Sequence, residues 1–183
     1  TAHPALAAIV PIITSDDYYE GWTYQGGAWQ LGFSVSWCLG NLVTANLAKS
    51  FAPDPVPPEL LERFMHAIDN MDEAFEFLPM KDFPYFKGLA QYFYDWGTHS
   101  RMDDYWKKIR IADHYGEIGV PALNVGGWFD IFKEGTLRNF VGMRQGAATE
   151  EARNGQKLIM GPWFHGAFTN LAGDQQYSAR AGE

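Results

Sequence analysis

The stretch Val120-Pro-Ala-Leu-Asn-Val-Gly-Gly-Trp-Phe-Asp130 decides the fold class, because an apolar run passes through a glycine pair to a carboxylate. Residues 120–126 predict a strand, and the apolar spacing over 133–143 predicts a helix directly after it. A second run, Lys157-Leu-Ile-Met-Gly161, predicts the next strand. This order of strand, helix and strand indicates an α/β fold with parallel strands.

A further strand is expected near the start of the chain. Residues 5–13 (ALAAIVPII) form an apolar run rich in β-branched residues, which predicts a buried strand. Three parallel strands leave both edges of a sheet open, so more strands are expected, mostly upstream of Thr1. The chain also starts without an initiator Met or a leader pattern. We therefore expect it to be a piece of a longer protein.

The region between the first two predicted strands is expected to be mostly helical. Residues 17–28 contain three glycines and no period, which indicates a structured loop. The apolar spacing over 29–50 favours a largely buried helix. Prolines in 52–58 should end it and pre-set the next helix, whose apolar residues between Leu61 and Leu78 share one face.

Ser100 and Asp103 have the spacing of a capping box that opens a helix over 104–111. His99 also lies four residues before Asp103, but too few further ligands are near for a metal site, so capping is the preferred interpretation. Two other histidines have no partner at ligand spacing: His66 and His114. No metal and no other cofactor is predicted.

Composition excludes several classes of function. The 183 residues carry 14 basic and 22 acidic side chains, a formal charge of −8, so nucleic acid and anionic membranes are not expected as partners. The weakly polar run 32–43 is too short to span a bilayer. The single Cys38 excludes an internal disulfide and is expected to be an inert buried thiol. A soluble protein, cytoplasmic or secreted from a bacterium, is expected, and a homo-oligomer is left open.

Asp130 and His165 are the candidate chemical groups, because each directly follows a predicted strand. Catalytic groups of open parallel sheets gather at the carboxyl ends of strands, so these two side chains are expected to meet. A carboxylate there can orient an imidazole that serves as a general base. The alternative is that Asp130 only caps the following helix and that His165 is an ordinary loop histidine.

The order Asp then His suits a triad whose serine comes earlier in the chain. Ser15 is nearest by position because it follows a predicted strand, but it lacks the flanking glycines of a G-x-S-x-G elbow. The other serines before Asp130 lack this elbow too: Ser34, Ser36, Ser50 and Ser100. The nucleophile is therefore not expected among these residues.

The motifs Gly-Gly-Trp-Phe-Asp130 and Gly-Pro-Trp-Phe-His165 resemble those of the superfamily that contains cocaine esterase, glutaryl-cephalosporin acylase, α-amino-acid ester hydrolases and Xaa-Pro dipeptidyl-peptidases. The resemblance extends over most of the chain. It also includes these stretches: His3-Pro-Ala-Leu6, Ser15-Asp16, Gly26-Gly-Ala28, His99, Asp103-Asp-Tyr-Trp106 and Val120-Pro-Ala-Leu123.

The resemblance implies the C-terminal part of an α/β-hydrolase parallel sheet with an inserted helical cap. It divides the chain into a core strand and loop (1–20), the cap (21–108) and a core segment with the catalytic Asp and His (109–183). Asp130 and His165 would be acid and base of a Ser-His-Asp triad. The serine would lie outside these residues, in a G-x-S-Y-x-G elbow shortly before Thr1. The oxyanion donors and a C-terminal jelly-roll domain would lie outside them too, so this chain alone should hydrolyse nothing.

The resemblance also implies an aromatic acyl pocket. Trp37 and Phe132 match pocket residues of that superfamily, although ordinary core packing is the alternative. Two more aromatic residues of the motifs are included as candidate substrate contacts: Trp128 and Trp163. The expected partner is a small-molecule ester or amide with a bulky acyl group.

Two alternatives remain open. An Xaa-Pro dipeptidyl-peptidase needs a carboxylate that holds a free amino terminus, as α-amino-acid ester hydrolases do for a substrate ammonium. The positions that carry those carboxylates in the hydrolases are Phe132 and Lys133 here, although Asp16 or Asp17 could supply one. A different class is an inactive hydrolase-like domain that only binds a partner.

Overall fold

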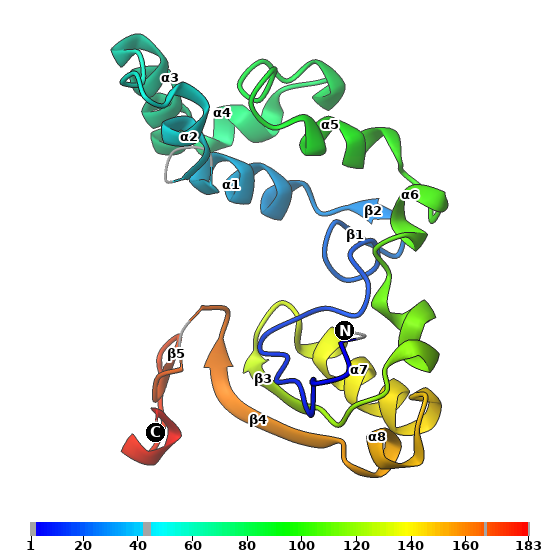
Figure 1. Ribbon diagram of the computed structural model, residues 1–183. Helices are drawn as coiled ribbons and strands as arrows, with labels where there is room; N and C mark the ends of the chain where they lie inside the picture. The colour runs from blue at the N-terminus through cyan, green and yellow to red at the C-terminus, as the bar shows by residue number, and fades with distance from the viewer. Residues whose placement is uncertain (1–2, 42–44, 167, 183) are drawn as a thin grey trace. The chain divides into compact units, whose positions relative to one another are not determined.

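The structure, a computed structural model, describes residues 3–41, 45–166 and 168–182. It divides into two compact units, whose elements are labelled in Figure 1. The first, here called the core unit, joins the residues up to Trp22 with those from Met102 onward. The second, the helical unit, comprises Thr23–Arg101 and is thus inserted between the two parts of the core unit.

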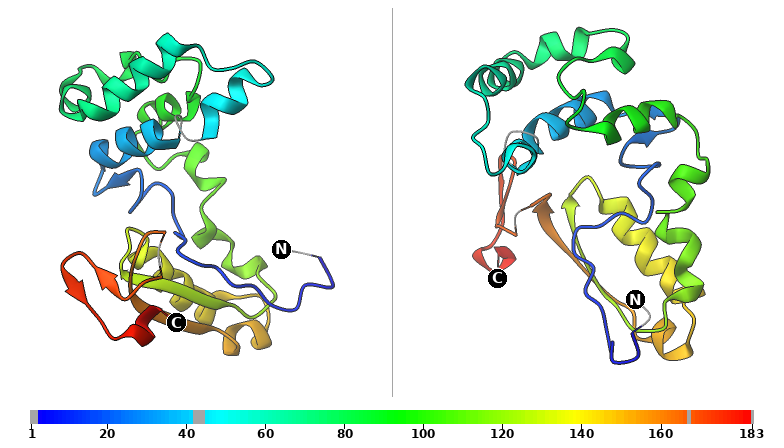
Figure 2. Two further views of the ribbon diagram at one scale, coloured as in Figure 1. Left: turned by 90° about the vertical axis from the view of Figure 1, so that its left-hand side faces the viewer. Right: turned by 45° about the horizontal axis from the view of Figure 1, so that its top comes forward.

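The core unit is built on two parallel strands, β3 (Leu123–Phe129) and β4 (Lys157–Phe164). Helix α7 (Lys133–Gly146) and the short helix α8 (Glu150–Asn154) connect them, and α7 covers one face of the pair (Figure 2). The predicted strand, helix and strand are therefore confirmed, and the fold is α/β with a parallel sheet. Helix α8, which Thr149 caps by accepting from the Ala152 N–H at 3.0 Å, was not predicted.

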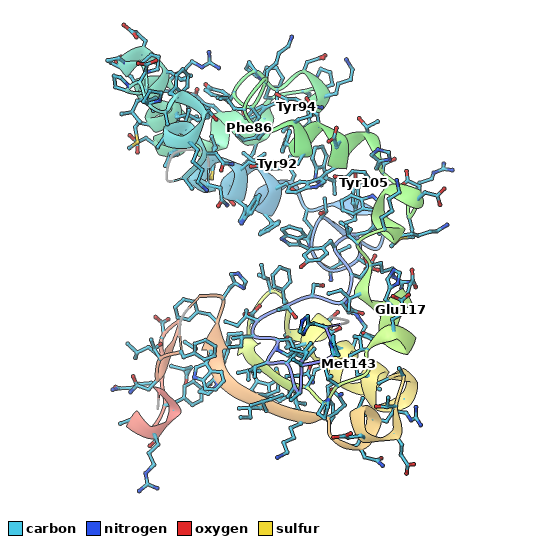
Figure 3. All side chains as sticks on the ribbon, in the orientation of Figure 1. Phe86, Tyr92, Tyr94, Tyr105, Glu117 and Met143 are labelled. Atoms are coloured by element: carbon cyan, nitrogen blue, oxygen red, sulfur yellow. The ribbon has the colours of Figure 1, made fainter. Side chains whose placement is uncertain are left out.

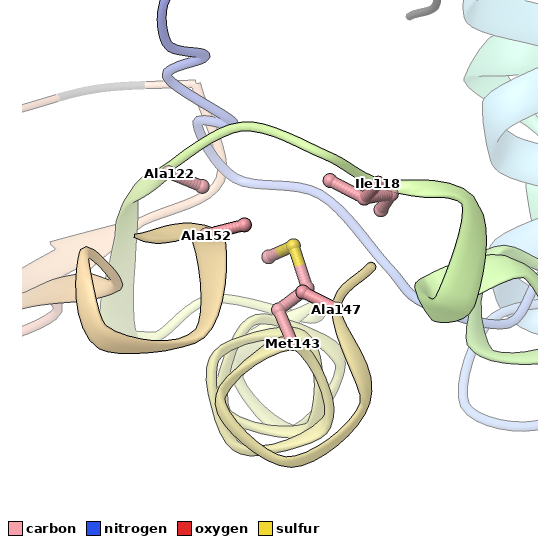
Figure 4. Close-up of a cluster of buried hydrophobic side chains, with 5 residues drawn as sticks. All are labelled: Ile118, Ala122, Met143, Ala147 and Ala152. Atoms are coloured by element: carbon pink, nitrogen blue, oxygen red, sulfur yellow. The ribbon is translucent and has the colours of Figure 1, made fainter. Parts of the chain in front are cut away.

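A small apolar cluster joins these elements. Small side chains let α7 and α8 approach the start of β3 closely, and Met143 fills the space between them (Figure 4). The cluster consists of Ile118, Ala122, Met143, Ala147 and Ala152, with Ile9 and Tyr115 packed against it. It anchors the amino-terminal end of β3, so that the strand is held firmly at the end remote from Asp130.

Residues 5–13 do not form the buried strand that their apolar run predicts. The segment does run parallel to β3, with bridges from Ile9 to Ala122 and from Ile12 to Val125. Pro11 lies between the two bridges and has no N–H to donate, which interrupts the ladder. Val10 and Ile12 are about half exposed, so the prediction of burial is wrong as well.

Two contacts hold the segment that leaves the core unit beside the segment that returns to it. The Arg110 Nε donates to Asp17 Oδ2 at 2.8 Å, and the rings of Tyr19 and Trp106 meet edge-on with centroids 5.6 Å apart. Helix α6 (Asp104–Lys107) lies on the returning segment. These contacts therefore join residues just before Trp22 to residues just after Met102.

Asp103 itself is the N-cap of α6, because its carboxylate accepts from the Tyr105 N–H at 3.0 Å. The predicted helix over 104–111 begins as expected but is too long. Helix α6 ends at Lys107, and a 3-10 helix, η3 (Ile111–Glu117), follows after a turn. The chain after β4 forms the two-residue strands β5 (Leu171–Ala172) and β6 (Gln175–Gln176) and the 3-10 turn η4 (Ala179–Gly182).

The helical unit begins with a hairpin inside the predicted loop 17–28. Strands β1 (Tyr24–Gln25) and β2 (Ala28–Trp29) pair antiparallel across Gly26 and Gly27, which have φ of 58° and 83°. Two successive positive φ values are the geometry of a type I′ turn, which glycine adopts without a steric penalty. Helix α1 (Leu31–Asn41) follows at once.

Two predicted helices are divided in the structure. Of the helix predicted over 29–50, α1 and α2 (Leu47–Phe51) are present, and residues 42–44 lie outside the described residues. The helix predicted between Leu61 and Leu78 is split into α3 (Pro58–Asp69) and α4 (Met71–Glu76). Asn70 separates them with a non-helical backbone (φ −121°, ψ 49°), and its side-chain amide donates to the His66 carbonyl, a local bond that competes with a continuing helix.

The core of the helical unit is aromatic. Phe83, Phe86 and Phe93 lie 4.7–5.9 Å apart between ring centroids, beside the 3-10 turn η2 (Met80–Asp82) and on helix α5 (Gln91–Thr98). Figure 3 labels Phe86 and two tyrosines of α5. Cys38 on α1 is fully buried, and this burial raises the pKa of its thiol to about 12. The expectation of a buried and unreactive thiol is therefore supported by its surroundings.

Candidate active site

Asp130 and His165 lie side by side at the carboxyl ends of the two parallel strands. Asp130 follows the last residue of β3, and His165 follows the last residue of β4. The His165 Nδ1 is 3.3 Å from both carboxylate oxygens of Asp130. The expected proximity of the two groups is thus confirmed, whereas their catalytic role stays a prediction.

A bulge in β4 sets this alignment. Gly127 is opposite Gly161, but two positions later Phe129 is opposite Phe164, so β4 contains one more residue than β3 over this interval. Such a bulge re-aims the side chains that follow it. Without the extra residue, position 164 and not position 165 would be opposite Asp130.

The bulge requires glycine at position 127. A Cβ built on Gly127 would lie 2.1 Å from the carbonyl oxygen of Trp163, which is far inside van der Waals contact. Similarly, a Cβ on Gly126 would lie 2.8 Å from the Thr136 side chain of α7. The glycine pair of the Gly-Gly-Trp-Phe-Asp130 motif therefore allows α7 and β4 to pack closely against β3.

The Asp130 carboxylate is fixed by a main-chain bond as well as by the histidine. Its side chain is 1% exposed, and its Oδ1 accepts from the Phe132 N–H at 2.6 Å. The Lys133 N–H bonds the Asp130 carbonyl at 3.2 Å, at the start of α7. The N-cap of α7 is Phe132 and no side chain caps that helix, so Asp130 is a partner of His165 and not the cap of α7.

The imidazole of His165 is half exposed, with 48% of its side chain accessible. An ionised carboxylate can only accept hydrogen bonds, so the bond to Asp130 places the proton of a neutral imidazole on Nδ1. The lone pair is then on Nε2, the nitrogen that a general base uses. The Phe132 ring contacts the imidazole edge to face, with centroids 5.1 Å apart and planes at 85°.

The predicted substrate-contact residues lie in different places. Phe132 adjoins the Asp–His pair, and Trp128 is exposed near the end of β3. Trp163 instead packs against the C-terminal segment, where its Nε1 donates to the Ala181 carbonyl at 2.6 Å and its ring meets Phe168. Trp37 is on α1 of the helical unit, within an aromatic group that includes Phe33, Tyr92 and Trp96.

Ser15, the serine nearest by position, has its hydroxyl engaged. It is buried, and its Oγ donates to the Asp17 carbonyl at 2.6 Å and accepts from the Asp17 N–H at 3.2 Å. Ser34 accepts from Trp29 Nε1, and Ser36 donates to the Gly32 carbonyl. These hydroxyls therefore have structural roles in the helical unit and in the loop after residues 5–13.

Two ion pairs near this loop, each between a buried carboxylate and a partly exposed arginine, were missed by the sequence analysis. Asp16 is bound by Arg138 of α7 through Nε at 2.9 Å to each oxygen and Nη2 at 2.8 Å, and Asp17 is bound by Arg110 at 2.8 Å. The bonds to Asp16 are the largest cause of the raised pKa of Arg138. Two acidic residues after an apolar run indicate that buried carboxylates need cationic partners. The sequence does not indicate which arginines these partners are.

The described residues contain no group of three or more His, Cys, Asp or Glu side chains arranged to hold a metal ion. Asp103, which was considered for such a role, caps α6. Within the same ranges no helix has the length and apolarity needed to cross a membrane.

A parallel sheet whose neighbouring strands end in a paired carboxylate and imidazole is the arrangement of an α/β hydrolase of the serine-hydrolase superfamily. Residues 1–167 match the model of the X-Pro dipeptidyl-peptidase (S15 family), and the chain belongs to this family.

The chain is also similar to the cocaine esterase of Rhodococcus sp. (strain MB1 Bresler), with 28% identity over 180 residues. The match covers 96% of this chain and 30% of that protein, so the chain spans about a third of the length of this relative. The superfamily that the sequence motifs indicated is confirmed by both comparisons.

Proposed function

We propose that Asp130 and His165 are the acid and the base of a Ser-His-Asp triad in an enzyme that cleaves esters or amides. The observation that carries this proposal is the 3.3 Å contact between the His165 Nδ1 and the Asp130 carboxylate at the ends of adjacent strands. The orientation leaves Nε2 available to a nucleophile, as a general base requires.

The serine of this triad is proposed to lie outside the 183 residues. No serine here stands in a G-x-S-x-G elbow, and the Ser15 hydroxyl is bonded within its own loop. In the proposed reaction, Nε2 of His165 takes the serine proton as the serine oxygen bonds the acyl carbon. The imidazolium then gives this proton to the leaving group, and water releases the acyl group by the same route. The chain alone is accordingly expected to be inactive.

The role of Asp130 in this proposal is orientation and charge stabilisation. A carboxylate that is 1% exposed and bonded by a backbone N–H cannot rotate freely, so it holds Nδ1 of His165 in one direction. It also stabilises the positive charge that the imidazole acquires when it takes the serine proton.

The helical unit is proposed to be the cap of the enzyme. Its place in the chain supports this role, because Thr23–Arg101 is inserted between the segment 5–13 and β3 of one core unit. The sequence proposes cap boundaries at 21 and 108, whereas the helical unit of the structure runs from Thr23 to Arg101. Trp37 would contribute to substrate binding from this unit.

The proposed substrate is an ester or amide with a bulky, uncharged acyl group. Phe132 presents an aromatic ring beside the Asp–His pair, whereas Asp16 and Asp17 are each already paired with an arginine. A substrate ammonium would therefore have to compete with a guanidinium for either carboxylate. This favours an esterase or acylase over an Xaa-Pro dipeptidyl-peptidase, which the description of the family suggests as the second candidate.

The experiment that tests the proposal uses the full-length protein in which this chain lies. Asp130→Asn and His165→Ala should each reduce turnover of a phenyl ester by about 10³-fold or more. His114→Ala is a matched control, because this exposed histidine pairs with Glu117 on the surface. Turnover within a few-fold of the wild type in either triad variant would refute the assignment.

Two further assays separate the alternatives. Faster cleavage of an Xaa-Pro anilide than of phenyl esters would favour the dipeptidyl-peptidase. A wild-type protein that cleaves neither substrate, and that lacks a G-x-S-x-G elbow upstream, would favour a binding domain.

A further inference from the structure

Phe132 contacts both members of the Asp–His pair, each through a different part of the residue. Its backbone N–H donates to Asp130 Oδ1 at 2.6 Å, and its ring meets the His165 imidazole at 5.1 Å between centroids with planes at 85°. The residue is only 9% exposed, so the ring position is determined by packing. One residue thus connects the carboxylate to the imidazole.

We propose that Phe132 is a positioning residue for the Asp130–His165 pair, beyond any contact it makes with an acyl group. This inference rests on the proposed function. The imidazole needs such support, because it is 48% exposed and its Nδ1 is 3.3 Å from each carboxylate oxygen, which is longer than a strong charge-assisted bond. A half-exposed side chain held by such a bond alone would sample other rotamers.

The ring of Phe132 is itself supported from behind. The indole of Trp22 contacts it with centroids 5.9 Å apart and planes at 72°. Trp22 ends the loop that Asp17 holds in place, since Asp17 Oδ1 accepts from the N–H groups of Tyr19 and Glu20. The contacts therefore continue from a buried carboxylate through two aromatic rings to the imidazole, all within the core unit.

Positioning and acyl binding make different predictions for the same substitution. If Phe132 orients His165, loss of the ring lowers the rate of the chemical step whatever the size of the acyl group. If Phe132 only forms a wall of the acyl pocket, loss of the ring weakens the binding of bulky acyl groups and spares small ones. A KM-against-kcat comparison on two esters with the same leaving group separates the two roles.

The test measures phenyl acetate and phenyl benzoate hydrolysis by the full-length protein. Phe132→Leu keeps the backbone N–H and removes the ring, so kcat should fall by about two- to tenfold on both esters with KM nearly unchanged. Phe132→Tyr keeps the ring and should stay close to the wild type. Loss confined to the benzoate, or expressed in KM alone, would overturn the inference, as would wild-type kcat in Phe132→Leu.

Two controls keep the result interpretable. Phe140→Leu makes the same change within α7, at a ring that lies under the Arg144 guanidinium, and should leave kcat unchanged. If Phe132→Leu fails to fold, Phe132→Met retains the volume without the ring, and the same kcat loss is expected. If His165→Ala retains activity, the proposed function fails; if it is inactive while Phe132→Leu and Phe132→Met match the wild type, only the positioning role fails.

The His165 imidazole offers a readout that does not depend on turnover. A perpendicular aromatic ring at 5.1 Å displaces the proton resonances of the imidazole by its ring current. Phe132→Leu should move the His165 resonances toward those of an unstacked histidine, and Phe132→Tyr should not. Unchanged His165 resonances in Phe132→Leu would contradict the contact on which the inference is based.

Discussion

Replacing Gly127 with alanine should disturb both the stability of the core unit and the alignment of its two candidate catalytic groups. The new Cβ would lie 2.1 Å from the carbonyl oxygen of Trp163 and 2.6 Å from its carbonyl carbon. Carbon and oxygen atoms pack at about 3.5 Å, so relieving the 2.1 Å contact needs a separation of the two strands by about 1.4 Å. The neighbour is backbone, which cannot turn away as a side chain does.

The magnitude follows from this displacement. Overpacking of a well-packed site costs about 1–3 kcal/mol, and a weakened hydrogen bond in the ladder adds about 1 kcal/mol. The free energy of unfolding should therefore fall by about 2–4 kcal/mol. A misplacement of about 1 Å at a catalytic pair can also reduce turnover by about 100-fold.

Urea denaturation and phenyl ester turnover, both measured on the full-length protein, test the two effects. Gly119→Ala is the matched control, because its Cβ would meet the Thr149 methyl carbon at 4.0 Å, an ordinary van der Waals contact. If Gly127→Ala were as stable as Gly119→Ala and equally active, the argument that the bulge sets the alignment would be wrong.

Three further predictions concern stability. Arg138→Met should lower the free energy of unfolding by about 2–3 kcal/mol, because it leaves the Asp16 carboxylate, which is 4% exposed, without its partner. The estimate is kept moderate because the arginine is 41% exposed, so solvent screens the pair. A urea double-mutant cycle with Asp16→Asn should show coupling and not additivity. Pro11→Val adds an N–H where the ladder is interrupted, and hydrogen exchange should find that amide protected, whereas fast exchange would contradict the register. Burial raises the pKa of Cys38 from 9.0 to about 12, so the folded state favours the neutral thiol. The contribution of this thiol to the free energy of unfolding should be complete below about pH 9 and be lost as pH rises toward 12. Circular dichroism of the wild type and Cys38→Ala across this pH range measures the loss.

The sequence predicted the part of the fold that depends on local pattern. The strands around Leu123 and Lys157, the helix from Lys133 and the positions of Asp130 and His165 after their strands all appear in the structure. Short apolar runs indicate these features, together with glycines at positions where a larger side chain would clash. The proximity of the two groups then follows from the parallel arrangement of adjacent strands.

The features that the sequence did not predict depend on partners distant in the chain. The bulge at Trp163 is set by contact with Gly127, and Arg138 was not recognised as the partner of Asp16 because 122 residues separate them. The split at Asn70 reflects a side chain that competes with its own helix, which an apolar period does not reveal. The prediction for residues 5–13 failed because one proline in an otherwise suitable run removes a donor.

The contacts of Asp17 with Arg110 and of Tyr19 with Trp106 make the helical unit an insertion whose two ends emerge next to each other. An inserted unit whose two ends lie next to each other can be replaced by one of a different length, because the distance between its two attachment points in the core unit stays the same. Selection can then alter the length and sequence of the inserted unit while strands β3 and β4 stay the same. A fold with this junction separates changes in the inserted unit from changes in the strands that carry Asp130 and His165.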